Sequence, residues 1–234
     1  MQVFKKVRDT YLFSTMRQLS GRDAAWFLLS EGFWRLSGGR MRVIKYHFLV
    51  QPLKAPAGVQ TRPRGNLEIR EVYEGDPVFG SMGRPSECVR SRFEQGARCL
   101  VALKNDELAG FLWWTEGPYK EDEVRCTFEP SPAGVSVWDF DVFVFPKHRL
   151  SMTFPRLWQE ASRRLSEQGF KYTCSRISAF NPGSLRSHQQ MKSKVVGSRV
   201  FIGIGSLELS VGRGRPRLSM SRKGSSGPWI TIAP

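Results

Sequence analysis

The run VSVWDFDVFVFPKHRLSMTFPRLWQEASRRLSE, residues 135–167, joins an apolar segment to an amphipathic one. The first part, which ends at Phe145, is rich in β-branched and aromatic residues and predicts a strand. Pro146 ends that strand, and a basic turn follows it. From Phe154 to Leu165 apolar residues recur at spacings of three and four with charged residues between them, which predicts a long helix with one buried face.

The segments on either side of this unit also alternate between strand and helix patterns. The expected elements are a strand at 67–72, short helices at 76–95, a hairpin at 98–104 and 108–115, a strand at 171–179, a helix at 182–192 and a hairpin at 195–204 and 207–211. This alternation predicts an α/β (α+β) fold with a mixed, mostly antiparallel sheet and flanking helices.

Composition shifts divide the chain into four parts. Residues 1–50 are expected to form an N-terminal helical extension that ends in a strand, and residues 51–66, rich in Pro and Gly, a linker. Residues 67–211 then form the main domain. Residues 212–234 are basic and rich in Gly and Ser, and we expect a disordered tail.

The net charge of +15 is concentrated at the two ends of the chain. Residues 1–45 hold nine basic and three acidic residues, and residues 212–234 hold five basic and none acidic. Basic ends on a nearly balanced body favour contact with an anionic membrane surface, nucleic acid or a polyanionic substrate. The alternative is that they are solvated segments that aid solubility.

Other features exclude several classes of protein. The four cysteines are widely spaced and the three histidines add no metal-ligand spacing, so we expect no metal. The N-terminal segment lacks the pattern of a signal peptide, and its apolar run is too short to span a bilayer. We therefore expect a cytoplasmic protein. An alternative is a cytoplasmic protein that is peripheral at the inner membrane surface.

The element order, together with the turn that follows Val144, resembles the GNAT superfamily of N-acetyltransferases. That resemblance implies a central splayed strand pair, and it implies that acetyl-CoA or another acyl-CoA binds as co-substrate with its pyrophosphate at the start of the long helix. The cofactor-binding residues implied at the turn are Val144, Arg149, Ser151, Met152, Thr153 and Phe154. The family usually has two glycines after the Arg, and this chain has Met152 and Phe154 instead, which either turn away from the ligand or block it.

A second motif resembles the family in the segment after the next strand. Asn181 and Ser184 match its Asn and small residue beside the CoA arm, and His188 falls where a Tyr often protonates the departing thiolate. A histidine can do this if its pKa is near neutral. The alternatives are a helix start at Asn181 and Ser184 and a packing or surface histidine.

Asp139 and Asp141 are the candidate general bases. At positions i and i+2 of a strand they are expected to face the same side, where each raises the pKa of the other. The alternatives are that they bind a cationic acceptor or hydrogen-bond nearby loops. Cys174 is expected to be a buried structural thiol.

The resemblance implies an acyltransferase that acts by direct attack. An amine-bearing small molecule or amino sugar would lose a proton and attack the thioester, a backbone N–H near Val144 would hold the oxyanion, and His188 would protonate the thiolate. Two alternatives are a GNAT-like binding module that has lost catalysis and a basic protein of the membrane surface or of nucleic acid. Nucleic acid is the least favoured partner, because the basic tail has few aromatic residues for stacking on bases.

Overall fold

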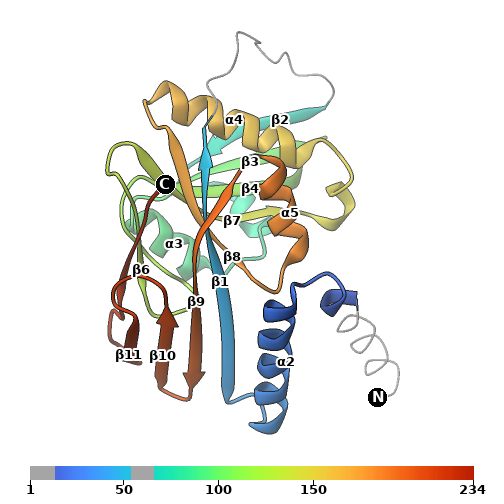
Figure 1. Ribbon diagram of the computed structural model, residues 1–234. Helices are drawn as coiled ribbons and strands as arrows, with labels where there is room; N and C mark the ends of the chain where they lie inside the picture. Colours follow the sequence, from blue (N-terminus) through green and yellow to red (C-terminus); the bar gives the residue numbers. More distant parts are fainter. Residues whose placement is uncertain (1–13, 54–65) are drawn as a thin grey trace. The chain divides into compact units, whose positions relative to one another are not determined.

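The computed structural model describes residues 14–53 and 66–234 (Figure 1). Contacts within the chain divide it into two compact units. Unit 1 comprises residues 1–51, 123–127 and 176–230, and unit 2 comprises residues 52–122, 128–175 and 231–234. Neither unit is a single stretch of sequence.

Unit 2 contains the strand–turn–helix that begins at Ser136. Its elements are β2 (Leu67–Val72), η1 (Pro77–Ser81), α3 (Ser86–Glu94), β3 (Arg98–Lys104), β4 (Glu107–Thr115), β7 (Ser136–Val144), η2 (Pro146–His148), α4 (Thr153–Glu167) and most of β8 (Tyr172–Ser178). The strand order is β8-β7-β4-β3-β2. Every pairing in this order is antiparallel except β7 with β8, which is parallel. A separate small sheet has the order β12-β6-β5, with bounds Trp229–Ile232, Thr127–Pro130 and Tyr119–Lys120.

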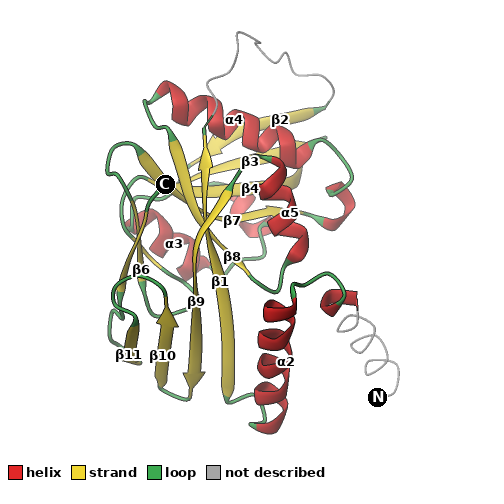
Figure 2. Ribbon diagram, viewed as in Figure 1, coloured by secondary structure: helices red, strands yellow, loops and turns green. Residues whose placement is uncertain are grey.

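The two faces of the unit 2 sheet carry different helices (Figure 2). Helix α4 packs against β2, β3 and β4. Its buried residues Leu157, Trp158, Ala161 and Leu165 are those of the predicted apolar face. The rings of Phe79 and Phe93, from η1 and α3, pack on Trp113 of β4. Since alternate residues of a strand face opposite sides, Trp113 and its neighbour Trp114 are buried on opposite faces.

Unit 1 contains the N-terminal and C-terminal elements. They are α2 (Gly21–Leu36), β1 (Met41–Pro52), α5 (Pro182–Gln190), β9 (Lys194–Ile204), β10 (Leu207–Gly212) and β11 (Leu218–Arg222). The strand order is β11-β10-β9-β1, and all these pairings are antiparallel. The Ser20 hydroxyl caps α2 by accepting from the N–H of Asp23. Asp23 then binds Lys45 of β1 at 2.7 Å, which ties the helix to the sheet.

The structure confirms the mixed, mostly antiparallel α/β sheet with flanking helices, and it corrects the expectation for residues 212–234. The tail is not disordered, because it forms β11 and β12. Its apolar residues alternate with polar ones over runs of only four or five residues, too short to stand out among Gly, Ser and Arg. Most of the expected linker, residues 54–65, and the start of the N-terminal extension, residues 1–13, lie outside the described residues.

Candidate functional site

The turn between β7 and α4 is built from backbone hydrogen bonds. The N–H of Phe145 donates to Ala109 of β4 at 3.0 Å, which holds the end of β7 on the sheet. The N–H of His148 then donates to Phe145 at 2.8 Å and closes the 3-10 turn. On the other side of the turn, a Cβ on Gly110 would lie 2.8 Å from the carbonyl oxygen of Phe143 and 3.3 Å from Thr153. Only glycine lets the strand and the helix start approach this closely.

Polar groups gather at the start of α4. The Ser151 hydroxyl donates to the His148 carbonyl at 2.7 Å, lies 2.8 Å from the Thr153 hydroxyl and accepts from the Thr153 N–H at 3.3 Å. Arg149 is exposed, and its Nε donates to the Val144 carbonyl at 3.3 Å. This cation beside a helix N-terminus favours an anionic group.

The two residues at the family's glycine positions differ in exposure. The side chain of Met152 is 61% exposed, whereas Phe154 is half-buried. Pro155, the third residue of α4, has no N–H to offer. The hydroxyls of Ser151 and Thr153 donate within the turn, so the turn suits an anion chiefly through Arg149, and Pro155 removes one backbone donor from the start of α4.

Strand β7 is interrupted by a bulge at Asp141 and Val142. Its register on β4 shifts at this point, between the pairs Trp113↔Phe140 and Phe111↔Phe143. Asp141 has a φ of 45°, in the left-handed region that Asp tolerates better than most residues. A bulge leaves an extra residue outside the ladder and redirects the side chains around it. The backbone therefore breaks its regular pairing just before the turn.

Asp139, on one side of the bulge, is buried without an ion pair. It is opposite Trp114 in the β4 register and only 2% exposed. Within the described part of the chain neither carboxylate oxygen has a hydrogen-bond partner. Burial raises the pKa of Asp139 to about 7, although the nearby Thr173 hydroxyl acts in the opposite direction.

Asp141, two residues further on, is held by arginines. Arg84 donates to both carboxylate oxygens, at 2.8 and 2.6 Å, and Arg92 donates to one of them at 2.7 Å. Burial raises the pKa of Asp141, but the two guanidinium groups outweigh it and hold this pKa below its ordinary value. Arg92 also binds Asp122, at 2.6 Å, and its guanidinium lies 5.2 Å from the centre of the Trp113 ring.

The expectation that the two aspartates face the same side and raise each other's pKa is therefore wrong. Asp139 is opposite Trp114, whereas Asp141 binds Arg92, which lies over Trp113 on the other face. The positive φ of Asp141 breaks the alternation that the prediction assumed. Sequence reasoning also missed Arg84 and Arg92. Their common partner lies 57 and 49 residues away, so no local pattern identifies them.

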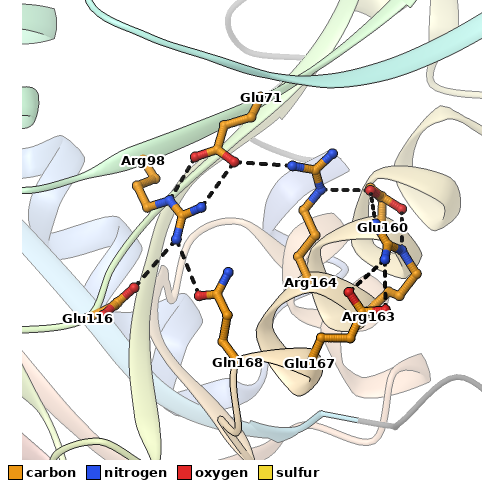
Figure 3. A network of polar contacts seen from close by, with 8 residues as sticks. All are labelled: Glu71, Arg98, Glu116, Glu160, Arg163, Arg164, Glu167 and Gln168. Carbon is orange, nitrogen blue, oxygen red and sulfur yellow. Dashed lines mark hydrogen bonds and ion pairs between the residues drawn. The ribbon is translucent and has the colours of Figure 1, made fainter.

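A charged network fixes helix α4 on the sheet (Figure 3). Glu71 of β2 binds Arg98 of β3 at 2.7 Å and Arg164 of α4 at 3.1 Å. Arg164 also binds Glu160, which in turn binds Arg163. Glu71 is nearly buried between its two guanidinium groups, so the network crosses from sheet to helix. It supports the helix whose first turn carries the candidate anion site.

The residues of the second motif lie in unit 1. Asn181 is the N-cap of α5, and its side-chain oxygen accepts from the Ser184 N–H at 3.1 Å. His188 is 3% exposed, and burial lowers its pKa to about 4. The condition for an acid catalyst at this position, a near-neutral pKa, is not met, because burial lowers the pKa of His188.

Cys174 is fully buried in unit 2. Its thiol donates to the Ile232 carbonyl at 3.5 Å, and burial raises its pKa to about 12. It is therefore a structural thiol. In the described part of the chain, no group of three His, Cys, Asp or Glu residues is placed to hold a metal ion. None of the described helices is both long and apolar enough to cross a membrane.

The element order of unit 2 and its strand–turn–helix agree with the order expected from the GNAT resemblance. The chain is similar to a tandem GNAT protein from the clavulanic acid biosynthesis pathway, with 13% identity, 79% of this chain and 58% of that chain covered, and a TM-score of 0.48. It is also similar to an aminoglycoside acetyltransferase from an uncultured soil metagenomic sample, with 15% identity, coverage of 54% and 88%, and a TM-score of 0.39.

A functionally unknown conserved protein from Staphylococcus epidermidis is similar as well, with 10% identity, 74% of this chain covered and a TM-score of 0.49. The chain spans 66% of that protein and 57% of a Drosophila protein that it also resembles. No protein-family model and no curated protein matches the sequence.

Proposed function

We propose that this protein is an acyl-CoA-dependent N-acyltransferase that transfers an acetyl or other acyl group to a primary amine. The observation that carries the proposal is the bulge at Asp141 and Val142, which comes directly before the anion-suited turn. In a regular ladder every N–H faces a partner, whereas a bulge frees one for another acceptor. A donor of this kind would stabilise the oxyanion that forms when an amine attacks a thioester.

The proposed proton transfers are based on the pKa values of the site. Asp139, with a pKa of about 7, is the general base, because an effective base has a pKa near the working pH. Its carboxylate is buried, so the amine proton reaches it through water. Asp141 holds Arg84 and Arg92 and maintains the bulge instead of acting as a base.

The remaining steps are the attack of the amine on the thioester and the departure and protonation of the thiolate. The amine nitrogen forms a bond to the thioester carbonyl, the C–S bond breaks, and the thiolate leaves with the electron pair. His188 is neutral at pH 7 because its pKa is about 4, so it is a weak acid there and solvent protonates the thiolate. The pyrophosphate binds Arg149 and the start of α4 beside Met152 and Phe154, and the hydroxyls of Ser151 and Thr153 hold the shape of this turn. We assign Asn181 and Ser184 to the CoA arm.

The proposal is tested first by binding. Isothermal titration of the full chain with acetyl-CoA should give saturable binding, and Arg149→Gln should weaken it by about tenfold, the loss of one charge-assisted contact. Arg90→Gln, an exposed cation on α3, is the matched control and should bind as wild type does. Met152→Gly should tighten binding because it permits closer backbone approach. Absence of saturation at millimolar acetyl-CoA would refute the proposal.

Turnover is tested with a panel of primary amines, including amino sugars, by the release of free thiol. The rate should increase with pH with an apparent pKa near 7, and Asp139→Asn should abolish that rise. His188→Ala should leave turnover unchanged. A rate lost in His188→Ala, with binding intact, would instead assign the acid role to this residue.

A second candidate function is a GNAT-like module that binds acyl-CoA without turnover. Pro155 favours it because it has no backbone N–H to donate, and the missing glycines favour it because the side chains of Met152 and Phe154 hinder close approach of a phosphate to the backbone. Binding of acetyl-CoA without thiol release from any amine in the panel would support this alternative.

A further inference from the structure

The outer strands of unit 1 expose apolar residues and bury polar ones. In β10 the side chains of Leu207, Leu209 and Val211 are 36–46% exposed, whereas those of Glu208 and Ser210 are buried. In an antiparallel sheet with one face against a core, the apolar residues normally face inward. Here the alternation is inverted, so an apolar face is turned outward.

The pairing register of β10 with β9 and β11 places these apolar side chains on the same face of the sheet as apolar side chains of the two neighbouring strands. Directly opposed residues of antiparallel strands lie on the same face. The pairs on this face are Ile204↔Leu207, Ile202↔Leu209, Val200↔Val211, Leu209↔Met220 and Val211↔Leu218. Met220 is 71% exposed and Leu218 is 62% exposed. We call Ile204, Leu207, Leu209, Val211, Leu218 and Met220 the outer apolar face.

The same face is covered where it reaches β1. Val43 pairs with Ile202 and Lys45 with Val200, so both lie on this face, and both are buried. Helix α2 covers this part, because Asp23 binds Lys45 and Ser30 donates to the Val43 carbonyl at 2.9 Å. The helix stops short of β10 and β11. The exposed residues of α2 include Leu28, Leu29, Trp34 and Leu36.

On the opposite face of β10, the polar side chains already have hydrogen-bond partners. Glu208 accepts from the Arg125 N–H at 2.6 Å, and Ser210 accepts from the buried Arg199 at 2.8 Å. If the strand were turned over, these hydrogen bonds would be lost, and the buried Arg199 would lose Ser210 as its acceptor. The outward position of the apolar residues is therefore fixed by the fold.

Charge around the outer apolar face is positive. The turn from β10 to β11 carries Arg213, Arg215 and Arg217, and β11 ends at Arg222 and Lys223, all exposed. Glu208 is the only carboxylate side chain in residues 194–234, and it is buried. A second copy would bring these cations together, which disfavours self-association. Nucleic acid would not use a patch of exposed aliphatic side chains.

We propose that the outer apolar face, with its arginine turn, binds an anionic lipid membrane surface. Aliphatic side chains with a basic rim match the combination of acyl chains and anionic headgroups. Arginine suits this boundary because its apolar stem lies along the hydrocarbon while the guanidinium reaches the headgroups.

The test is co-sedimentation of the full chain with vesicles of phosphatidylcholine alone, or with about one quarter phosphatidylserine. Binding should require phosphatidylserine and fall as salt is raised. Since each basic residue near an anionic surface contributes about fivefold, Arg213→Gln with Arg215→Gln and Arg217→Gln should weaken binding on the order of a hundredfold. Leu209→Ser with Met220→Ser should weaken it at least about tenfold.

Matched controls lie in unit 2. Tyr73→Ser removes an exposed apolar side chain and Arg90→Gln an exposed cation, and both should bind as wild type does. Melting temperatures establish that every variant is folded, and the charge variants test the proposal independently of the apolar pair.

Four outcomes would overturn the proposal. They are no sedimentation with either vesicle, equal binding to phosphatidylcholine alone, binding that the Leu209 and Met220 changes leave intact, and a dimer in sedimentation velocity that those changes dissociate. If the Leu209 and Met220 changes leave binding intact, the site binds polyanions in general, and the protein should then also be retained on heparin. The last assigns the face to a second copy of the chain.

Discussion

Replacing Asp139 by Asn should change how stability depends on pH. The carboxyl has an ordinary pKa of 3.8, which burial raises to about 7 in the folded protein. Below pH 4 both states hold the proton and the group contributes nothing. Between pH 4 and pH 7 the unfolded chain loses a proton that the folded chain keeps, so stability falls by about 1.36 kcal/mol per pH unit. Above pH 7 the cost is constant, at roughly 4 kcal/mol.

The Asp139→Asn variant has no ionisable group at this position, so its unfolding free energy does not fall with pH in this way. Its unfolding free energy relative to wild type should therefore increase by roughly 2 to 3 kcal/mol between pH 5 and pH 8. The buried amide lacks partners just as the carboxyl does, but that penalty is the same at each pH. Urea unfolding at several pH values, followed by tryptophan fluorescence, measures the difference in unit 2, where Trp114 lies opposite this residue.

Asp141→Asn is the control for this experiment. The pKa of Asp141 is lowered, so its stabilising effect is complete above its ordinary pKa of 3.8 and is lost only at more acidic pH. The variant should be less stable than wild type by a constant amount from pH 5 to pH 8. If Asp139→Asn also shows a constant difference over this range, the raised pKa of Asp139 is refuted, and with it the argument for a base at this position.

Arg92→Met should destabilise the protein by about 3 kcal/mol in urea unfolding, because it leaves two carboxylates without their buried partner; an unchanged midpoint would contradict this. Gly110→Ala should cost about 2 kcal/mol and lower the melting temperature, because its Cβ would meet the Phe143 carbonyl oxygen at 2.8 Å. Glu71→Gln should cost about 2 kcal/mol by breaking the network on α4. Glu116→Gln, which removes an exposed partner at 3.6 Å, should be nearly neutral, and equal effects of the last two changes would refute the role of burial.

Helix α4 and the strand before it could be predicted because their signals are local. The apolar spacing from Leu157 to Leu165 matches the buried face, and Pro146 falls at the end of β7 as expected. The same is true of the hairpins at 98–115 and 195–211, whose strands were placed to within a few residues. Periodicity identifies such elements because burial on one side selects apolar residues there.

The candidate site was less predictable because its features depend on distant partners. The local sequence WDFDVFV gives no signal that predicts the bulge at Asp141. The Asp141 carboxylate is held there by Arg84 and Arg92, which are far away in the sequence. The pKa values of Asp139 and His188 likewise depend on burial by segments far away in sequence. The splayed strand pair and the CoA contacts of Asn181 and Ser184 stay predictions.

The division of the chain into interleaved units has a consequence for the order of folding. Residues 231–234 belong to unit 2, and the Ile232 carbonyl accepts a hydrogen bond from the Cys174 thiol. Unit 2 therefore completes its packing only after residues 231–234 have been synthesised, and unit 1 likewise needs β9, from residues 194–204, to pair with β1. Neither unit can complete its fold from the first half of the sequence alone, and a protein shortened at Gly212 would lose part of both.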